Sequence, residues 1–158
     1  MSGRVEQLWI KRAKRGVMDS VQHAVVRSNR GIVGNANQGG RRQVTILEVE
    51  RWQEHLTALN ATLDPARRRA NILVSGFALR DTRNQVLQIG NVRFRVAGET
   101  KPCEQMDEAL PGLQAVMRPA WGGGAFAIVL DDGEIGVGDA VQWTDQTEEF
   151  PLQQRMLW

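Results

Sequence analysis

The 158 residues amount to 17.7 kDa, the size of one domain whose core needs neither disulfides nor a structural metal. Hydrophobic residues make up 42% and charged residues 24%, proportions that exclude wholesale disorder. The longest apolar run, residues 125–130, is much shorter than the roughly 20 residues that span a bilayer. Because the N-terminus also lacks a signal-peptide core, we expect a cytoplasmic protein that does not bind membranes.

The net charge of +2 conceals an asymmetry along the chain. Residues 1–69 contain 13 Lys and Arg against six Asp and Glu, whereas residues 70–158 contain seven against 12. Of the 20 basic residues 17 are Arg, whose planar guanidinium group can bind phosphate or carboxylate through two hydrogen bonds. This bias is compatible with a small anionic ligand and equally with a solvated charged face. The small net charge argues against nucleic acid as a partner.

The first half of the chain combines short strands with one helix. Residues 31–43 contain four glycines and two asparagines, which predicts a loop with several positive φ angles. Apolar residues at Val49, Trp52, Leu56 and Leu59 have the spacing of one helix face that ends near Asn60. Asp64 and Pro65 then predict a second helical turn through residue 69. Strands are expected at residues 5–11, 21–27, 44–47 and 72–74.

The second half is mainly β in character. Residues 92–96 alternate apolar side chains with Arg93 and Arg95, which predicts a strand with a polar outer face. Apolar residues between Cys103 and Met117 suit two short helices broken at Pro111 and Gly112. The end of the chain predicts a hairpin plus one more strand. The strands expected in this half are residues 86–89, 92–96, 125–130, 134–137 and 141–143.

Many short strands, few short helices and no alternating strand–helix pattern predict a mainly β, α+β fold. We expect a closed or nearly closed β-barrel formed by residues 1–143 as a single domain. Residues 144–158 form the predicted C-terminal tail, whose apolar side chains would pack on the barrel or on a partner chain.

Cys103 is the only cysteine and therefore cannot form a disulfide within the chain. It follows a predicted strand that ends near Gly98, so it belongs to an exposed loop at a barrel mouth. Lys101 and the start of a helix would help to hold a thiolate, whereas Glu104 would oppose it. Although many free cysteines are buried and inert, this context favours a functional thiol.

The other candidate groups are better explained by structure. His23 and His55 have no partner at helical spacing, so they do not form a zinc pair, although a Cys–His pair could still meet in space. We expect His55 to be a surface or half-buried structural residue. The segment at residues 131–133, Asp-Asp-Gly, predicts a hairpin turn rather than a carboxylate site. Residues 122–124, three glycines, lack a phosphate-loop ending and predict a flexible lip near Cys103.

Four segments in order resemble the motifs of the MOSC domain family, named for the C-terminus of eukaryotic molybdenum-cofactor sulfurases. They are GIVGNANQGGRRQVTILE, RRANILVSGFAL, LQIGNVRFRVAGETKPCEQM and GEIGVGDAV. The resemblance spans roughly residues 5–143. Two positions differ from many members, because Asn35 and Ala70 stand where those members carry acidic residues.

The resemblance implies a β-barrel in which Cys103 carries sulfur as a persulfide or ligates molybdenum in a pterin cofactor. It also implies that basic and glycine-rich loops face the phosphate of that cofactor. Arg41 and Arg42 take this role, with Arg69 and Asn71 on the opposite lip and Lys101 beside the thiol. The chain has no aminotransferase-like domain for pyridoxal phosphate, so a cysteine desulfurase or an electron donor would be a separate protein.

Three functions remain open from the sequence. The first is a sulfur carrier or molybdenum-cofactor-binding domain. The second is a molybdenum-dependent reductase of N-hydroxylated compounds, which would need a separate electron donor because the chain has no flavin or iron–sulfur motif. The third is a barrel that binds a small anion or a protein and catalyses no reaction.

Overall fold

The computed structural model describes residues 3–147, with the last three described by their backbone alone. Its first half contains β1 (Gly3–Lys11), β2 (Met18–Val21), β3 (His23–Arg27), β4 (Gly31–Ile32), β5 (Val44–Glu48), α1 (Val49–Ala58), the 3-10 helix η1 (Pro65–Arg68) and β6 (Ile72–Ser75). Its second half contains β7 (Gln85–Ile89), β8 (Val92–Glu99), α2 (Gln105–Ala109), α3 (Leu113–Met117), the 3-10 helix η2 (Pro119–Trp121), β9 (Ala125–Val129), β10 (Gly133–Gly136) and β11 (Ala140–Thr147).

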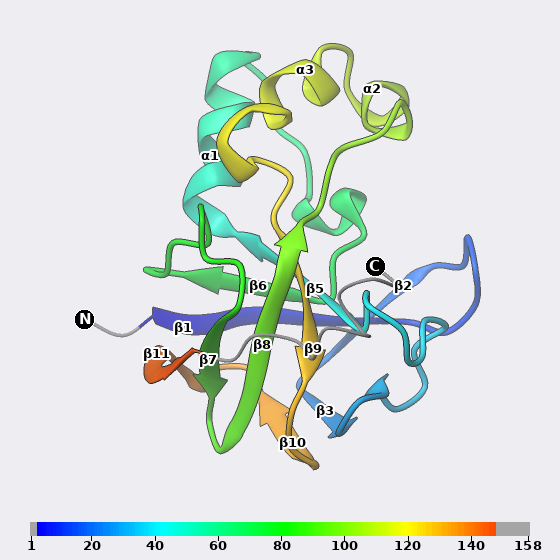
Figure 1. The fold of residues 1–158 in the computed structure, drawn as a ribbon. Coiled ribbons are helices and arrows are strands. Elements are labelled where there is room, and N and C mark those ends of the chain that lie inside the picture. Colours follow the sequence, from blue (N-terminus) through cyan, green and yellow to red (C-terminus); the bar gives the residue numbers. More distant parts are fainter. Residues whose placement is uncertain (1–2, 148–158) are drawn as a thin grey trace.

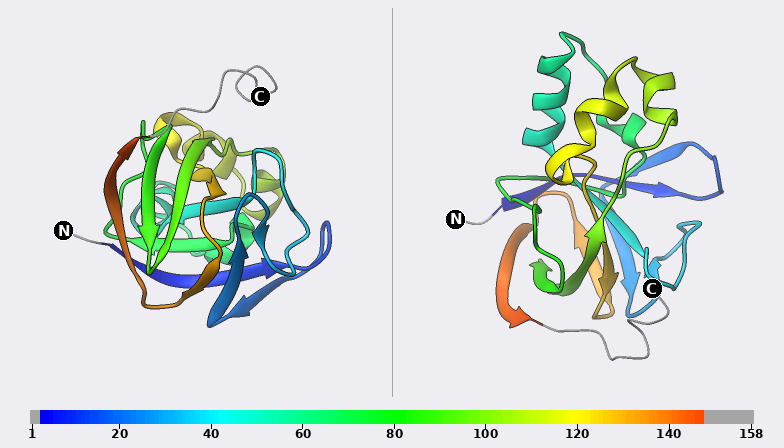
Figure 2. Two further views of the ribbon diagram at one scale, coloured as in Figure 1. Left: turned by 60° about the horizontal axis from the view of Figure 1, so that its bottom comes forward. Right: turned by 45° about the horizontal axis from the view of Figure 1, so that its top comes forward.

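Seven strands close into a barrel in the order β11-β7-β8-β9-β5-β6-β1, because β1 also pairs with β11. The strands enclose the core in the left view of Figure 2. Strand β2 pairs antiparallel with the C-terminal half of β1 and does not belong to the ring of seven strands. Strands β10, β3 and β4 form a separate small sheet. The pair β5–β6 is parallel, so the chain between them must cross over, and α1 and η1 lie in that crossover. The predicted closed barrel is confirmed.

Alternating side chains on the strands separate two apolar layers. Ile46, Ile72 and Val74 point into the barrel core, whereas Leu47 and Leu73 point outward and pack against the helices. The three α-helices therefore gather at one end of the barrel, as Figure 1 shows. The outer layer consists of Trp9, Leu47, Trp52, Ala70, Leu73, Met106, Leu113 and Met117.

The helical predictions agree with the structure. Helix α1 ends at Ala58, and Asn60 follows with a φ of 50°. Asp64 caps η1 by accepting a hydrogen bond from the backbone N–H of Ala66 at 2.9 Å. Helices α2 and α3 are separated at Pro111 and Gly112, as the sequence predicts.

One strand prediction is modified and one is wrong. The strand expected at residues 21–27 is β3, which begins at His23, because Val21 belongs to β2 and pairs with β1 whereas β3 pairs with β10 and β4. Residues 125–137 do not form a hairpin, because β9 pairs with β5 and β8, and β10 pairs with β3. The Asp-Asp-Gly segment contacts other parts of the chain instead. Asp132 accepts a hydrogen bond from the Ser28 backbone N–H at 2.7 Å, and Asp131 forms a salt bridge with Arg93.

Two further expectations are modified by the structure. The outer face of β8 is not simply polar and solvated, since Arg95 is only 8% exposed. Strand β11 continues to Thr147, beyond the predicted domain boundary at residue 143. The rest of the predicted tail, residues 148–158, lies outside the described residues, so its packing stays a prediction.

None of the helices in residues 3–147 has the length and apolar character needed to span a membrane.

Candidate functional site

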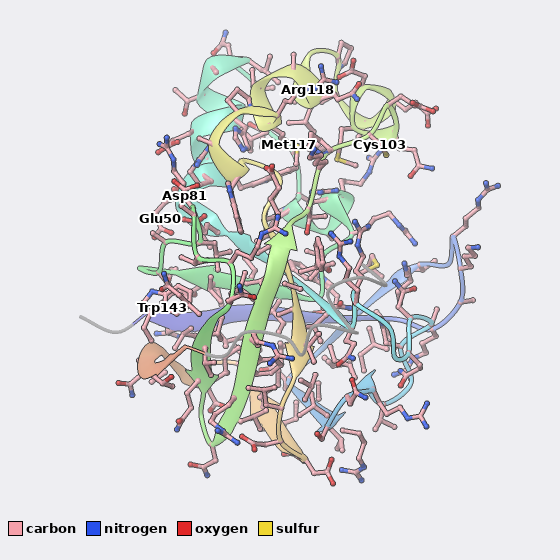
Figure 3. The ribbon with its side chains drawn as sticks, viewed as in Figure 1. Glu50, Asp81, Cys103, Met117, Arg118 and Trp143 are labelled. Carbon is pink, nitrogen blue, oxygen red and sulfur yellow. The ribbon has the colours of Figure 1, made fainter. Side chains whose placement is uncertain are left out.

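Cys103 lies at the end of the barrel where the helices gather (Figure 3). Strand β8 ends at Glu99, and the next residue is anchored because the Thr100 backbone N–H donates to the Gly124 carbonyl at 2.8 Å. Pro102 is buried beneath the loop, whereas Cys103 is exposed. The Cys103 carbonyl accepts a hydrogen bond from the Met106 N–H at 3.0 Å. A fixed backbone thus presents an accessible thiol, in agreement with the predicted exposed loop.

A cavity of about 200 Å³ lies beside this thiol. It brings together cationic side chains from the end of β1, the glycine-rich loop and the η1 turn, and none of its lining residues is Asp or Glu. The cavity is therefore strongly positive, which favours an anionic occupant. Its lining residues are Lys11, Asn35, Asn37, Arg42, Gln43, Val44, Thr45, Ile46, Arg68, Arg69, Ala70, Asn71, Thr100, Cys103, Gln105, Met106 and Gly123.

Arg68 is one of the cations that line the cavity, and it is not among the site residues predicted from the sequence. Its Nε donates to the Gly123 carbonyl at 3.0 Å and its Nη2 to the Thr100 carbonyl at 3.2 Å. No carboxylate within residues 3–147 forms a salt bridge with it. Burial lowers the Arg68 pKa to about 10, and the neighbouring Cys103 opposes that shift. Arg68 therefore remains a cation at neutral pH, with carbonyls in place of a counter-ion.

Three more cations line the same cavity. Arg69 has a φ of 65° at the end of η1, and its Nη2 donates to the Gly16 carbonyl at 2.7 Å. The Lys11 pKa is lowered from its ordinary value, first by burial and then by the positive charges of Arg69 and Arg42. These cations repel one another, so an anion between them would relieve an unfavourable interaction.

Asn71 occupies a polar wall of the cavity together with Asn35. The Asn71 Nδ2 donates to the Trp9 carbonyl at 3.2 Å and to Asn35 Oδ1 at 3.1 Å. Its Oδ1 accepts from the Thr45 backbone N–H at 3.1 Å, while Asn35 Oδ1 also accepts from the Lys11 N–H at 2.9 Å. Asn35 and Ala70 both line the Cys103 cavity.

Thr100 adds an unused polar group to this cavity. The residue lines the cavity and is 8% exposed, and its buried Oγ1 has no hydrogen-bond partner within the described part of the chain. A buried hydroxyl without a partner costs free energy unless a ligand or water satisfies it. A hydroxyl without a partner therefore lies in a residue that lines the cavity.

A second cavity of about 640 Å³ adjoins the first, and Arg42 lines both. The guanidinium carbons of Arg41 and Arg42 each lie 5.1 Å from the centre of the Phe126 ring, within cation–π distance. Lys101 and Glu99 line this second cavity. The predicted group is therefore divided: Arg42, Arg69 and Asn71 line the Cys103 cavity, whereas Arg41 and Lys101 line the second one.

The three glycines at residues 122–124 lie beside the cavity, as expected, but they are buried and hydrogen-bonded rather than forming a free lip. The Gly122 carbonyl accepts from Nε2 of His55 at 2.8 Å. His55 is 4% exposed and therefore buried, not at the surface or half-buried as expected, and burial lowers its pKa, which favours the neutral ring. A Cβ at Gly123 would collide with the Thr100 carbonyl, so only glycine fits there. His23 is exposed and lies near Glu134.

Four of the cavity residues are predicted from the sequence as site residues, whereas Lys11, Asn35, Arg68 and Thr100 are not. Arg68 is the middle residue of a run of three arginines. Arg69 follows it in a left-handed conformation at the end of η1. That run after Asp64 and Pro65 is the one sequence signal that could have pointed to Arg68. Thr100 carries no such signal.

Comparisons with known proteins agree with this architecture. The model of the MOSC domain matches residues 34–142. The structure resembles the YuaD protein of Bacillus subtilis with a TM-score of 0.77 and 22% identity, over 89% of this chain and 94% of that one. It resembles YiiM of Geobacillus stearothermophilus with a TM-score of 0.73 and 14% identity, over 90% and 75% of the two chains. For YiiM of Escherichia coli the TM-score is 0.70 and the identity 13%, over 98% and 75%. No curated protein matches the chain.

Proposed function

The chain belongs to the MOSC domain family, and from that premise we propose that it is a sulfur-carrier or molybdenum-cofactor-binding protein with Cys103 as its reactive group. The observation that carries the proposal is the exposed thiol beside a cavity with four cations and no carboxylate. A thiolate or a persulfide anion is stabilised by such surroundings. A soft thiolate also suits molybdenum as a ligand.

The side chains around Cys103 would divide the work. Arg68 is fixed by two carbonyls and lines the cavity beside Cys103, so it would bind an anion at the reactive sulfur. Arg42 and Arg69 would bind the anionic part of a ligand, since guanidinium groups bind oxyanions through paired hydrogen bonds. Thr100 would donate its unused hydroxyl proton to the same ligand.

The cationic lining of the two cavities is the feature that supports a molybdenum–pterin cofactor as the ligand. Within residues 3–147 no three His, Cys, Asp or Glu side chains come together as a metal site. The cavity beside Cys103 is smaller than the roughly 300 Å³ at which pockets for such molecules begin, so a pterin would also need the second cavity that shares Arg42. Bound there, the cofactor would supply the redox and ligand-exchange chemistry of molybdenum. Cys103 would offer one thiolate ligand, and Arg41, Arg42 and Lys101 would face its phosphate.

Partners follow from what the chain itself would need. A sulfur carrier needs a donor of sulfur, which would be a separate cysteine desulfurase, and a metal-dependent reductase would need a separate electron donor. The exposed Cys103 thiol beside the cationic cavity is the feature that favours the carrier and cofactor-binding functions over a barrel that catalyses no reaction.

The proposal is tested on protein freshly isolated from cells that synthesise the cofactor. Intact mass spectrometry should show one added sulfur atom on a fraction of the chains, or the protein should contain molybdenum and fluoresce as a pterin. Both signals should disappear in a Cys103→Ala variant. Protein that carries neither sulfur nor cofactor would leave only the barrel that catalyses no reaction. A variant that keeps the wild-type signals would show that Cys103 is not the reactive group.

A further inference from the structure

The size and charge of the Cys103 cavity indicate which kind of sulfur donor it could admit, and this inference rests on the proposed sulfur-carrier function. At about 200 Å³ it is below the roughly 300–1,000 Å³ typical of pockets for drug-sized ligands. It can therefore admit a small inorganic ion without help from the second cavity. A sulfur donor that enters this cavity must therefore be small, must suit the charge of the cavity and must react with the Cys103 thiol.

The charge of the cavity favours an anion. Lys11, Arg42, Arg68 and Arg69 line it, and the Lys11 pKa is lowered partly by the positive charges of Arg69 and Arg42. Arg68 makes no salt bridge with a carboxylate among the described residues, although its Nε and Nη2 bind carbonyls. Unneutralised cations in a partly buried site favour an anion strongly, because solvent screens their repulsion poorly there.

Thr100 provides the second, independent indication of a ligand. Its Oγ1 is buried and lacks a hydrogen-bond partner within residues 3–147, while the residue lines the cavity and is 8% exposed. A hydroxyl can donate to an oxyanion oxygen at the same time as the guanidinium groups do. The site therefore combines fixed cations, a neutral donor and an exposed thiol within one small space.

We propose that Cys103 accepts sulfur directly from a small sulfane-sulfur oxyanion, of which thiosulfate is the simplest probe, with Arg42, Arg68 and Arg69 binding its oxygens. The Cys103 thiolate attacks the outer sulfur of the ion. A new sulfur–sulfur bond forms to Cys103 as the original one breaks, and sulfite leaves with the electron pair of the broken bond. The resulting persulfide gives its outer sulfur to a nucleophile and regenerates the thiolate, so no oxidant or reductant is consumed.

The test follows thiocyanate production from thiosulfate and cyanide by the full-length protein. The wild type should turn over, and Cys103→Ser should not. Arg42→Gln should lower the rate roughly 10-fold or more, because one charge-assisted hydrogen bond to the anion is lost. Arg42 is exposed, so this change should leave the fold intact. The matched control is Arg30→Gln, which removes the same charge from an exposed residue that lines neither cavity and should turn over like the wild type.

A second sulfur donor, inorganic polysulfide, distinguishes failure of the thiosulfate proposal from failure of the sulfur-carrier function. Inorganic polysulfide adds sulfur to reactive thiolates in general, and intact mass spectrometry reports that addition. If polysulfide modifies Cys103 but thiosulfate gives no turnover, the oxyanion donor is wrong and the sulfur carrier stands. If neither donor modifies Cys103, the sulfur-carrier function itself falls. Equal rates in Arg42→Gln and Arg30→Gln would show that the cavity does not recognise the anion.

Discussion

At the scale of single residues, the direction of each hydrogen bond in the cavity wall determines which substitutions the site accepts. Asn35 and Asn71 are both buried and adjacent, yet they play opposite roles. Asn35 Oδ1 only accepts, from the Lys11 N–H and from Asn71, whereas Asn71 Nδ2 donates to Asn35 and to the Trp9 carbonyl. The same chemical change should therefore have different consequences at the two positions.

Asn71→Asp should destabilise the protein by more than about 2 kcal/mol, because it places a carboxylate oxygen against two acceptors and removes two donors. Asn35→Asp keeps the accepting oxygen and should cost much less. Urea unfolding of both variants measures the free energies of unfolding. Equal losses in the two variants would mean that the assigned donor and acceptor roles are wrong.

At the scale of elements, the junction between β5 and α1 carries a buried acid. Glu48 is 7% exposed, and burial raises its pKa from 4.5 to about 7. A hydrogen bond from the backbone of Leu79 and the charge of Arg51 oppose that shift, whereas Glu50 and Glu54 add to it. Because the folded protein binds this proton more tightly than the unfolded chain, the stabilising contribution is complete below pH 4.5 and is lost as the pH rises through about 7.

Glu48→Gln should remove this pH dependence. Relative to the variant, the wild type should lose on the order of 2–3 kcal/mol of unfolding free energy as the pH rises across this window. Urea unfolding at about pH 5 and about pH 8 measures the difference. Glu108→Gln alters an exposed acid and serves as the control. A constant difference between wild type and Glu48→Gln would contradict the raised pKa.

Elements whose signals are local could be predicted from the sequence. Helix α1 and the Asp64-capped turn depend on neighbouring residues, so spacing and capping identified them. The pairing of β10 with β3 could not be predicted, because it depends on contacts such as that between Asp132 and Ser28, which are 104 positions apart. The site follows the same division. Cys103 was found from its loop, whereas Arg68 and Thr100 acquire their roles from tertiary placement.

At the scale of the whole molecule, the part of the barrel core around Leu87 lies apart from the Cys103 cavity. Leu87 on β7 is fully buried and pairs with Phe94 and Trp143 on its two neighbouring strands. None of these residues lines the cavity. Figure 3 shows Trp143 beside β11, away from Cys103 at the helical end. Changes in the two regions should therefore be nearly additive.

Leu87→Ala should lower the free energy of unfolding by about 2–5 kcal/mol, because it leaves a cavity in the barrel core. The rate of Cys103 alkylation in the folded variant should remain that of the wild type. Urea unfolding and timed alkylation under native conditions measure the two quantities. A changed alkylation rate in folded protein would show that the core and the site are coupled.

The proposed function depends most on Cys103 being an accessible thiol among cations, and paired alkylating reagents test this directly. Iodoacetate is an anion and iodoacetamide is neutral, and the single cysteine makes the modified site unambiguous. The ratio of their rates should be several-fold higher for the native protein than for a peptide with the sequence KPCEQM, and salt should reduce that preference. A ratio equal to that of the peptide, or a thiol that reacts with neither reagent, would contradict the account.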